Sequence, residues 1–349
     1  MADLSNPIPA ERSAGSPSPE SVPADVRRAD EPTRVGRFVV RRVHRSEIHA
    51  AVRLVLGRMG DPADDTAVLD FLRFAVMRRI DLGEMQVAAG AEKGPSEKLV
   101  FVAAPIRSPG GSAIVSCTAD PDAEVLPAAR LALERACTGL AGARYSLAQV
   151  LVEAGDATLG RLVRDAGFGP VATLSYMLRS VPANPSAPQL PDGYRLLPFT
   201  EAVYPRFRDT VAATYEGSLD CPALNGLRSI DDVMAGHRAA GEFHADLWQL
   251  LLEGETAVGA VLLAGVPNRA LGEVVYLGLT PGARGRGLSD VLMRVGLASA
   301  RAHRFDGLTL AVDAENTPAI RLYQRHGMRQ VYTREAWMKQ LGGVRKLGS

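Results

Sequence analysis

The sequence has few cysteines and no marked excess of either charge. Its 349 residues include three cysteines, Cys117, Cys137 and Cys221, and the formal net charge is +1. An odd number of widely spaced cysteines argues against a disulfide framework or a zinc site and fits a reducing cytoplasm, so we expect no bound metal. The balanced charge offers no basic face, so nucleic acid is not an expected partner.

Long hydrophobic runs are absent as well. The longest, such as residues 257–266, are too short to span a bilayer. The N-terminus has no basic segment followed by an apolar one, which argues against a secretory signal. Together these absences predict a cytoplasmic protein without a membrane partner.

Two stretches are too polar or too rich in proline for a folded core. Residues 1–35 have almost no large apolar side chains, which predicts a disordered tail. Residues 182–192 carry four prolines, which neither a helix nor a central strand tolerates, so we predict a linker there. The chain then divides into domains at 36–181 and 193–341, with a C-terminal tail at 342–349.

The two predicted domains have the same order of elements. Each reads as a strand, two helices, three strands, a helix, a strand, a helix and a final strand. Their ends correspond at an offset of about 160 residues, with helices expected at 157–166 and 317–326. This pattern predicts an α/β fold (an α+β mixed sheet) in two tandem copies, each with helices on both faces of its sheet.

A glycine-rich turn in the second copy has the features of an anion site. A strand over 271–279 leads into P-G-A-R-G-R-G at 281–287, and a helix with an apolar stripe follows. The first amides of a helix have no internal partner, and the helix dipole adds positive charge there. Glycines let the backbone approach a ligand, and arginines suit phosphate, so a diphosphate is the expected ligand. A tight surface turn that only caps the helix is the plain alternative.

Alternation along the strand before this turn assigns its side chains to two faces. The predicted faces are Val274, Tyr276 and Gly278 on one side, and Glu273, Val275 and Leu277 on the other.

A second pattern follows at 313–328, where a strand end leads into a short helix. Asn316 is a natural N-cap, and Pro318 lies in the first turn, where its missing amide costs least. Gly327 ends the helix, and Tyr323 is expected to face inward.

These two patterns, P-x-x-R-G-x-G and N-x-x-A-x-x-L-Y-x-x-x-G-[FM], resemble the GNAT superfamily of N-acetyltransferases over about 60 residues. The resemblance implies two tandem GNAT-like domains and acetyl-CoA as the co-substrate. The sequence departs from the family pattern at Ser289, where Gly or Ala is usual; one extra oxygen predicts tighter packing rather than loss of binding.

By this resemblance, the amides of residues 284–288 would hold the CoA diphosphate, and Asn316 would contact the pantetheine or the adenosine-side phosphates. A strand amide near Leu279 would polarise the thioester carbonyl. The predicted cofactor-binding residues are Leu279, Arg284, Gly285, Arg286, Gly287, Leu288, Ser289 and Asn316.

The resemblance also implies catalytic roles. Tyr323 would lie near the CoA sulfur and donate a proton to the departing thiolate. Glu273 would be the general base, because an alkyl amine is mostly protonated at neutral pH and cannot attack in that form. The alternatives are a core tyrosine and an exposed or merely orienting carboxylate.

By the same resemblance, the acceptor would bind between the last strands and the loop that joins the first two helices of the second copy. This loop supplies aromatic, acidic and amide groups, which suit a polar or cationic amine; the candidates are Tyr215, Glu216, Asp220 and Asn225. A solvated loop without substrate contacts is the alternative. Cys221, in the same loop, is not expected to act as a nucleophile.

The first copy lacks this chemistry. The 160-residue offset places Asp156 opposite Asn316 and Val163 opposite Tyr323. The segment 118–127 falls where the glycine-rich turn should be, but it has no glycine or arginine and carries three carboxylates, which would repel a diphosphate. We therefore predict a degenerate domain that keeps the fold without binding CoA.

The predicted function is N-acetyl transfer from acetyl-CoA to a primary amine, by direct attack in a ternary complex. Transfer of a different acyl group, or transfer to a hydroxyl acceptor, is the alternative if the protein is an enzyme. A CoA-binding sensor or scaffold without chemistry is the rival from another class.

Overall fold

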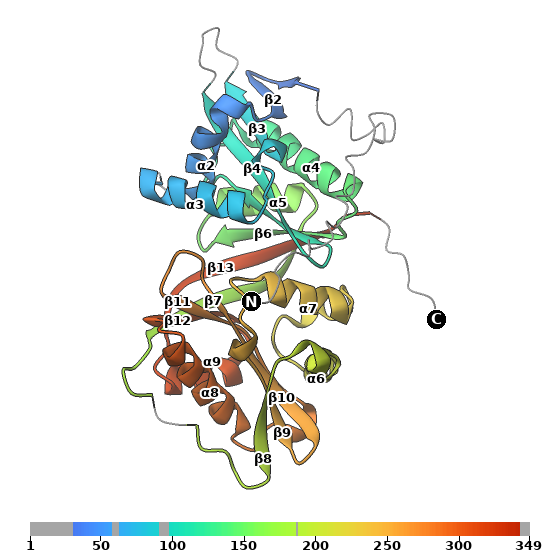
Figure 1. Ribbon diagram of the computed structural model, residues 1–349. Helices are drawn as coiled ribbons and strands as arrows, with labels where there is room; N and C mark the ends of the chain where they lie inside the picture. Colours follow the sequence, from blue (N-terminus) through green and yellow to red (C-terminus); the bar gives the residue numbers. More distant parts are fainter. Residues whose placement is uncertain (1–30, 58–62, 91–97, 186–187, 343–349) are drawn as a thin grey trace, which may run out of the picture.

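The computed structural model describes residues 31–57, 63–90, 98–185 and 188–342 (Figure 1). Most of the predicted N-terminal tail and residues 343–349 of the predicted C-terminal tail lie outside these ranges. At the end of the predicted N-terminal tail, Thr33–Val35 are not disordered as expected. They form a strand, β1, which pairs with the next strand through a tight turn at Gly36.

The N-terminal half follows the predicted order. Its elements are β1, β2 (Phe38–Arg42), α2 (Ile48–Leu56), α3 (Asp65–Met77), β3 (Gln86–Gly90), β4 (Leu99–Ser108), β5 (Ser112–Cys117), α4 (Leu126–Gly142), β6 (Leu147–Glu153), α5 (Ala157–Asp165) and β7 (Gly169–Ser180).

The C-terminal half repeats this order, which confirms the predicted mixed α/β fold. Its elements are β8 (Tyr194–Pro198), α6 (Tyr204–Thr214), α7 (Ile230–Ala239), β9 (Trp248–Glu253), β10 (Thr256–Gly265), β11 (Leu271–Leu279), α8 (Leu288–Ala302), β12 (Gly307–Asp313), α9 (Thr317–Arg325) and β13 (Arg329–Gln340).

The strands of the described residues form one continuous sheet, and the two halves exchange their last strands. The spatial order is β1-β2-β3-β4-β5-β6-β13-β7-β12-β11-β10-β9-β8. β13, from the end of the chain, pairs with β6, and β7 pairs with β12. Each half is therefore completed by a strand of the other, and β7 and β13 cross the middle of the molecule together (Figure 1).

The hydrophobic cores follow this exchange. Trp337 and Leu341, from the C-terminal end, are buried in the core beneath α4 and α5 of the first half. Met177 and Val181, from the end of the first half, are buried in the core of the second. The proposed division at 182–192 therefore separates the halves along the chain but not in the sheet.

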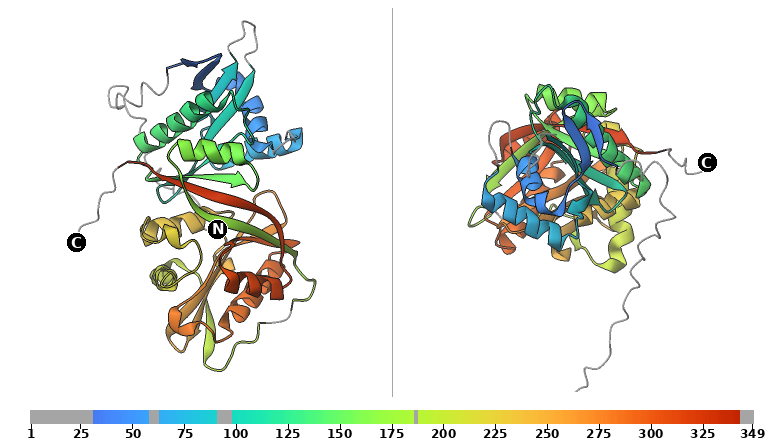
Figure 2. Two further views of the ribbon diagram at one scale, coloured as in Figure 1. Left: turned by 180° about the vertical axis from the view of Figure 1, so that it is seen from behind. Right: turned by 90° about the horizontal axis from the view of Figure 1, so that it is seen from above.

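In the second half, the helices cover both faces of the sheet. α6 and α7 lie on one face, and α8 and α9 on the other (Figure 2). The predicted apolar stripe of α8 is confirmed, since its members are all buried: Leu288, Val291, Leu292 and Val295.

Candidate active site

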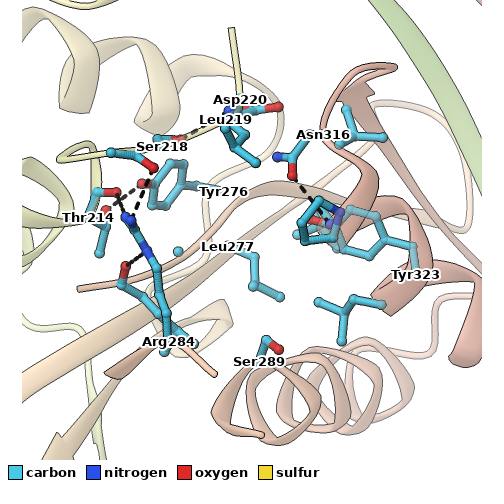
Figure 3. Close-up of a pocket in the computed structure, with 18 of the residues that line it drawn as sticks. Thr214, Ser218, Leu219, Asp220, Tyr276, Leu277, Arg284, Ser289, Asn316 and Tyr323 are labelled. Atoms are coloured by element: carbon cyan, nitrogen blue, oxygen red, sulfur yellow. Dashed lines mark hydrogen bonds between the residues drawn. The ribbon is translucent and has the colours of Figure 1, made fainter. Parts of the chain in front are cut away.

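The site begins where β11 and β12 separate. The two parallel strands pair only from Leu271–Glu273 to Gly307–Thr309. Beyond that point β11 stays with β10 as far as Leu279, and a cavity of about 320 Å³ opens on its other edge (Figure 3). The split therefore exposes one edge of β11 to a ligand.

The amide of Leu279 points toward this split. The next amide, that of Thr280, donates to the carbonyl of Val258 at 2.9 Å, on the β10 side. Because amides alternate in direction along a strand, the Leu279 amide faces the opposite edge. A carbonyl placed in the split would meet it.

A β-bulge in β11 changes the predicted faces of this strand. Leu262 pairs with Tyr276 and Leu263 with Val274, so Val275 is the extra residue. Alternation is broken at Val275, and the side chain of Glu273 lies on the α6–α7 face with Tyr276, not opposite it. The predicted faces were wrong here because a bulge cannot be read from alternation alone.

The glycine-rich turn has the geometry of an anion site. Gly285 and Gly287 have φ angles of 72° and 75°, and a Cβ added at either would meet no atom within 4 Å. Within the described residues, no acceptor lies in hydrogen-bond geometry with the amides of residues 285–289. These amides and the dipole of the 15-residue α8 are thus free for a diphosphate.

The two arginines of the turn bond to protein groups. The Arg284 guanidinium donates to the carbonyls of Leu279, Thr214, Glu216 and Gly217 at 2.7–3.2 Å. It therefore ties the turn to the end of α6.

The second arginine of the turn, Arg286, forms a two-pronged ion pair with Glu253, at 2.7 and 3.0 Å, and donates to the hydroxyl of Tyr194. The N–H groups of both guanidinium groups therefore already donate to protein groups, and the backbone amides remain the direct donors at the turn.

Two carboxylates, the buried Asp313 and the more exposed Asp220, fasten the loop after α6 to the end of β12. Asp220 accepts from the Asp313 amide at 3.1 Å, and Asp313 accepts from the Cys221 amide at 3.2 Å. The Asn316 side chain caps α9 by accepting from the Ala319 amide. Desolvation raises the pKa of Asp220, against the lowering effect of the Asp313 amide and of the Asn316 side chain.

Tyr323 lies on the buried face of α9 and lines the cavity (Figure 3). Only 7% of it is exposed. Burial, and then the nearby charge of Asp220, raises the pKa of its hydroxyl well above the ordinary value. The hydroxyl therefore stays protonated at neutral pH, as a proton donor must.

Glu273 lies outside the lining of the cavity, on the α6–α7 face. Burial raises the pKa of its carboxyl to about 6. On the same face, the Tyr276 ring lies 5.2 Å from the His237 ring and 5.6 Å from the Tyr215 ring, and burial lowers the pKa of His237 to about 4. This face thus combines a titratable carboxylate with a partly buried aromatic wall.

The cavity collects about half of the residues predicted for the site. Those that line it are Asp220, Leu279, Arg284, Gly285, Ser289, Asn316 and Tyr323. Those that do not line it are Tyr215, Glu216, Asn225, Glu273, Arg286, Gly287 and Leu288. Sequence reasoning missed the structural role of Asp313, whose only signal was its position three residues before Asn316.

In the first half, Asp156 stands at the position that corresponds to Asn316. The Asp156 carboxylate caps α5 at the Leu159 amide, as Asn316 caps α9, and its second oxygen accepts from the Asp120 amide at 2.7 Å. The acidic segment that replaces the glycine-rich turn is therefore folded onto the start of α5. The absence of a CoA site there stays a prediction.

No three His, Cys, Asp or Glu side chains of the described residues are grouped to hold a metal. No helix among the described ranges is long and apolar enough to cross a bilayer.

Comparison with known proteins points to the acetyltransferases. Residues 217–328 match the acetyltransferase (GNAT) family. The mycothiol acetyltransferase of Actinosynnema mirum is 29% identical over 161 residues, covering 46% of this chain and 53% of the relative. That of Streptomyces scabiei is 29% identical over 184 residues, covering 51% and 57%. The chain thus aligns with only about half the length of these curated relatives.

Solved structures match the whole tandem fold. A GCN5-related N-acetyltransferase from Sphaerobacter thermophilus has a TM-score of 0.65 at 19% identity, over 89% of this chain and 98% of that chain. A tandem GNAT protein from the clavulanic acid biosynthesis pathway has a TM-score of 0.51 at 13% identity, over 88% and 99%. Residues 217–328 therefore match the acetyltransferase (GNAT) family, the described fold is that of solved tandem GNAT structures, and part of the chain resembles the mycothiol acetyltransferases.

Proposed function

We propose that the protein transfers the acetyl group of acetyl-CoA to a primary amine, by direct attack within a ternary complex. The observation that carries this proposal is the split between β11 and β12. One cavity there joins the glycine-rich turn, the free edge of β11 and Tyr323.

Each end of this cavity suits one part of acetyl-CoA. The free amides of residues 285–289 would hold the diphosphate at the start of α8. The pantetheine arm would lie along the open edge of β11 as an added strand. The Leu279 amide would then donate a polarising hydrogen bond to the oxygen of the thioester carbonyl.

Proton transfers follow from the two titratable groups. Glu273, as the carboxylate, would take the proton that the ammonium must lose before its nitrogen attacks the acetyl carbon. Tyr323 would give its proton to sulfur as the C–S bond breaks. The second proton that the nitrogen loses on becoming an amide would pass to solvent, Glu273 would release its proton to solvent, and Tyr323 would regain one from it. A raised pKa suits both roles, since Glu273 becomes a stronger base and Tyr323 keeps its proton.

The acceptor would approach from the α6–α7 face. Glu273, Tyr276 and Tyr215 offer a carboxylate beside aromatic rings, a combination that attracts a cationic amine. Because the relatives are mycothiol acetyltransferases, the acceptor of those enzymes belongs in the first panel of amines. Hydroxyl acceptors belong in the same panel as the competing class.

Calorimetric titration with acetyl-CoA tests the cofactor assignment. We expect one site per chain, because the first half lacks the glycine-rich turn and carries three carboxylates in its place. Two sites per chain would show that the first half also binds. An absence of binding would overturn the proposed function, and binding without turnover of any acceptor in the panel would favour a CoA sensor.

The Glu273→Gln variant tests the base. In the wild type, kcat should fall tenfold per pH unit below the pKa of about 6, because protonation removes the base. The glutamine cannot accept a proton, so the variant should lose this acidic limb and turn over about 10- to 100-fold more slowly at neutral pH. The measurement is kcat against pH, with the exposed Glu255→Gln as the control. An unchanged acidic limb in Glu273→Gln would assign the base elsewhere.

A further inference from the structure

α7 forms a wall of the acceptor side, and contacts with the first half hold it at both ends. The helix spans Ile230–Ala239 and lies on the same face of the sheet as α6 (Figure 2). In the ribbon, it lies next to the crossing strands at the middle of the molecule (Figure 1). The elements that touch its two ends come from the N-terminal half of the chain.

The first contact is at the start of α7. The hairpin turn between β4 and β5 contains Gly110, with φ of 86°. A Cβ there would lie 2.1 Å from the carbonyl oxygen of Asp232, in the first turn of α7, and 2.9 Å from the Arg228 guanidinium. Backbone meets backbone at this point, so only glycine permits the approach.

The second contact is at the end of α7. Arg78, which follows α3, donates to the carbonyls of Ala239 and Gly241 at 3.0 and 2.6 Å. The last carbonyls of a helix have no internal partner, and a cation is favourable there. Arg78 therefore caps α7 from a position more than 160 residues away in the chain.

Both contacts lead to the acceptor side of the site. A Cβ at Gly241, whose carbonyl Arg78 holds, would lie 3.0 Å from Cβ of Ala264, the residue that pairs with Glu273. In the middle of α7, the His237 ring packs 5.2 Å from the Tyr276 ring. A shift of α7 would therefore move the surroundings of Glu273 and Tyr276, but not the glycine-rich turn.

We infer that Gly110 and Arg78 are positioning residues for the acceptor: the degenerate half holds α7 against the sheet and so sets the shape of the acceptor side. The inference rests on the proposed function for its catalytic consequence. It gives the first half a task that needs no CoA site of its own. The glycine-rich turn is anchored to the end of α6 and not to α7, so binding of acetyl-CoA should depend on these contacts less than binding of the amine does.

The test compares Arg78→Ala and Gly110→Ala with matched controls in the full chain. Arg73→Ala is the control for the arginine, since Arg73 lies on α3 and is exposed. Gly36→Ala is the control for the glycine, since Gly36 also has a positive φ, of 59°, but a Cβ there would meet nothing within 4 Å. It therefore reproduces the backbone strain without the clash.

Two readouts separate positioning from general destabilisation. Amide hydrogen exchange over residues 233–241 should rise about tenfold or more in Arg78→Ala and Gly110→Ala, and not in the controls. With the best amine of the panel, KM for the amine should rise about fivefold or more, while the Kd for acetyl-CoA stays within about twofold. Arg78→Lys should recover part of the loss, because the ammonium still donates to the carbonyls.

Unchanged exchange in α7 would overturn the inference, as would faster exchange with an unchanged KM for the amine. The exchange measurement needs no acceptor, so failure to find one would count against the proposed function and not against the contacts. If Gly110→Ala prevents folding, Arg78→Ala and its lysine counterpart carry the test alone.

Discussion

Replacing Tyr323 by phenylalanine should lower kcat about 100- to 1,000-fold and leave the Kd for acetyl-CoA within about threefold. The substitution removes one hydroxyl and keeps the ring. The ring packs with the buried core of the second half, so packing and the cavity wall should persist. What is lost is the proton donor for the departing thiolate.

The size of the effect follows from the environment of this hydroxyl. Burial raises its pKa, so the phenol is fully protonated and can donate at every working pH. Because the side chain is almost fully buried, a solvent molecule does not readily replace the hydroxyl, and general acid catalysis of this kind accounts for factors of about 10² to 10⁴.

The wild type and Tyr323→Phe are compared by kcat at saturating acetyl-CoA and by calorimetry of acetyl-CoA binding. Tyr145→Phe is the control, since Tyr145 packs against the core of the first half. A normal kcat in Tyr323→Phe would assign Tyr323 to packing alone and leave the thiolate to be protonated by another group.

Replacing Ser289 by glutamate should weaken binding of acetyl-CoA about 100-fold or more, while the melting temperature is kept or raised. Ser289 is in the first turn of α8 and lines the cavity. A carboxylate there would satisfy the free amides and complement the helix dipole. It would also occupy the position of the diphosphate and repel it.

Stability and binding should therefore change in opposite directions, which a general folding defect cannot imitate. Ser289→Ala, which restores the residue type usual in the family, should bind acetyl-CoA within about threefold of the wild type. Thermal unfolding and calorimetric titration of the three proteins give both quantities. Normal binding by Ser289→Glu would show that the diphosphate lies elsewhere.

Local patterns in the sequence predicted the local parts of the site. The apolar stripe of α8 and the N-cap at Asn316 depend on residues within one or two turns, so spacing alone determined them. The order of elements followed in the same way. These features place the cavity correctly between β11, β12 and the starts of two helices.

Features that depend on residues far away in the chain could not be predicted from local sequence patterns. The bulge at Val275 is set by pairing with β10, and alternation cannot reveal it. Arg284 reads as a phosphate ligand in isolation, but it bonds carbonyls near residue 215. The exchange of β7 and β13 could not be predicted either, because nothing in a strand sequence states which neighbour it will pair with.

The exchange of last strands limits how the two halves can diverge. Loss of the glycine-rich turn in the first copy removes a ligand site and leaves the sheet intact. Loss of β7, by contrast, would uncover β12 and remove Met177 from the core of the copy that carries the site. A chain with this fold can therefore do without a ligand site in its first half, but it cannot lose that half. The two halves must be inherited together.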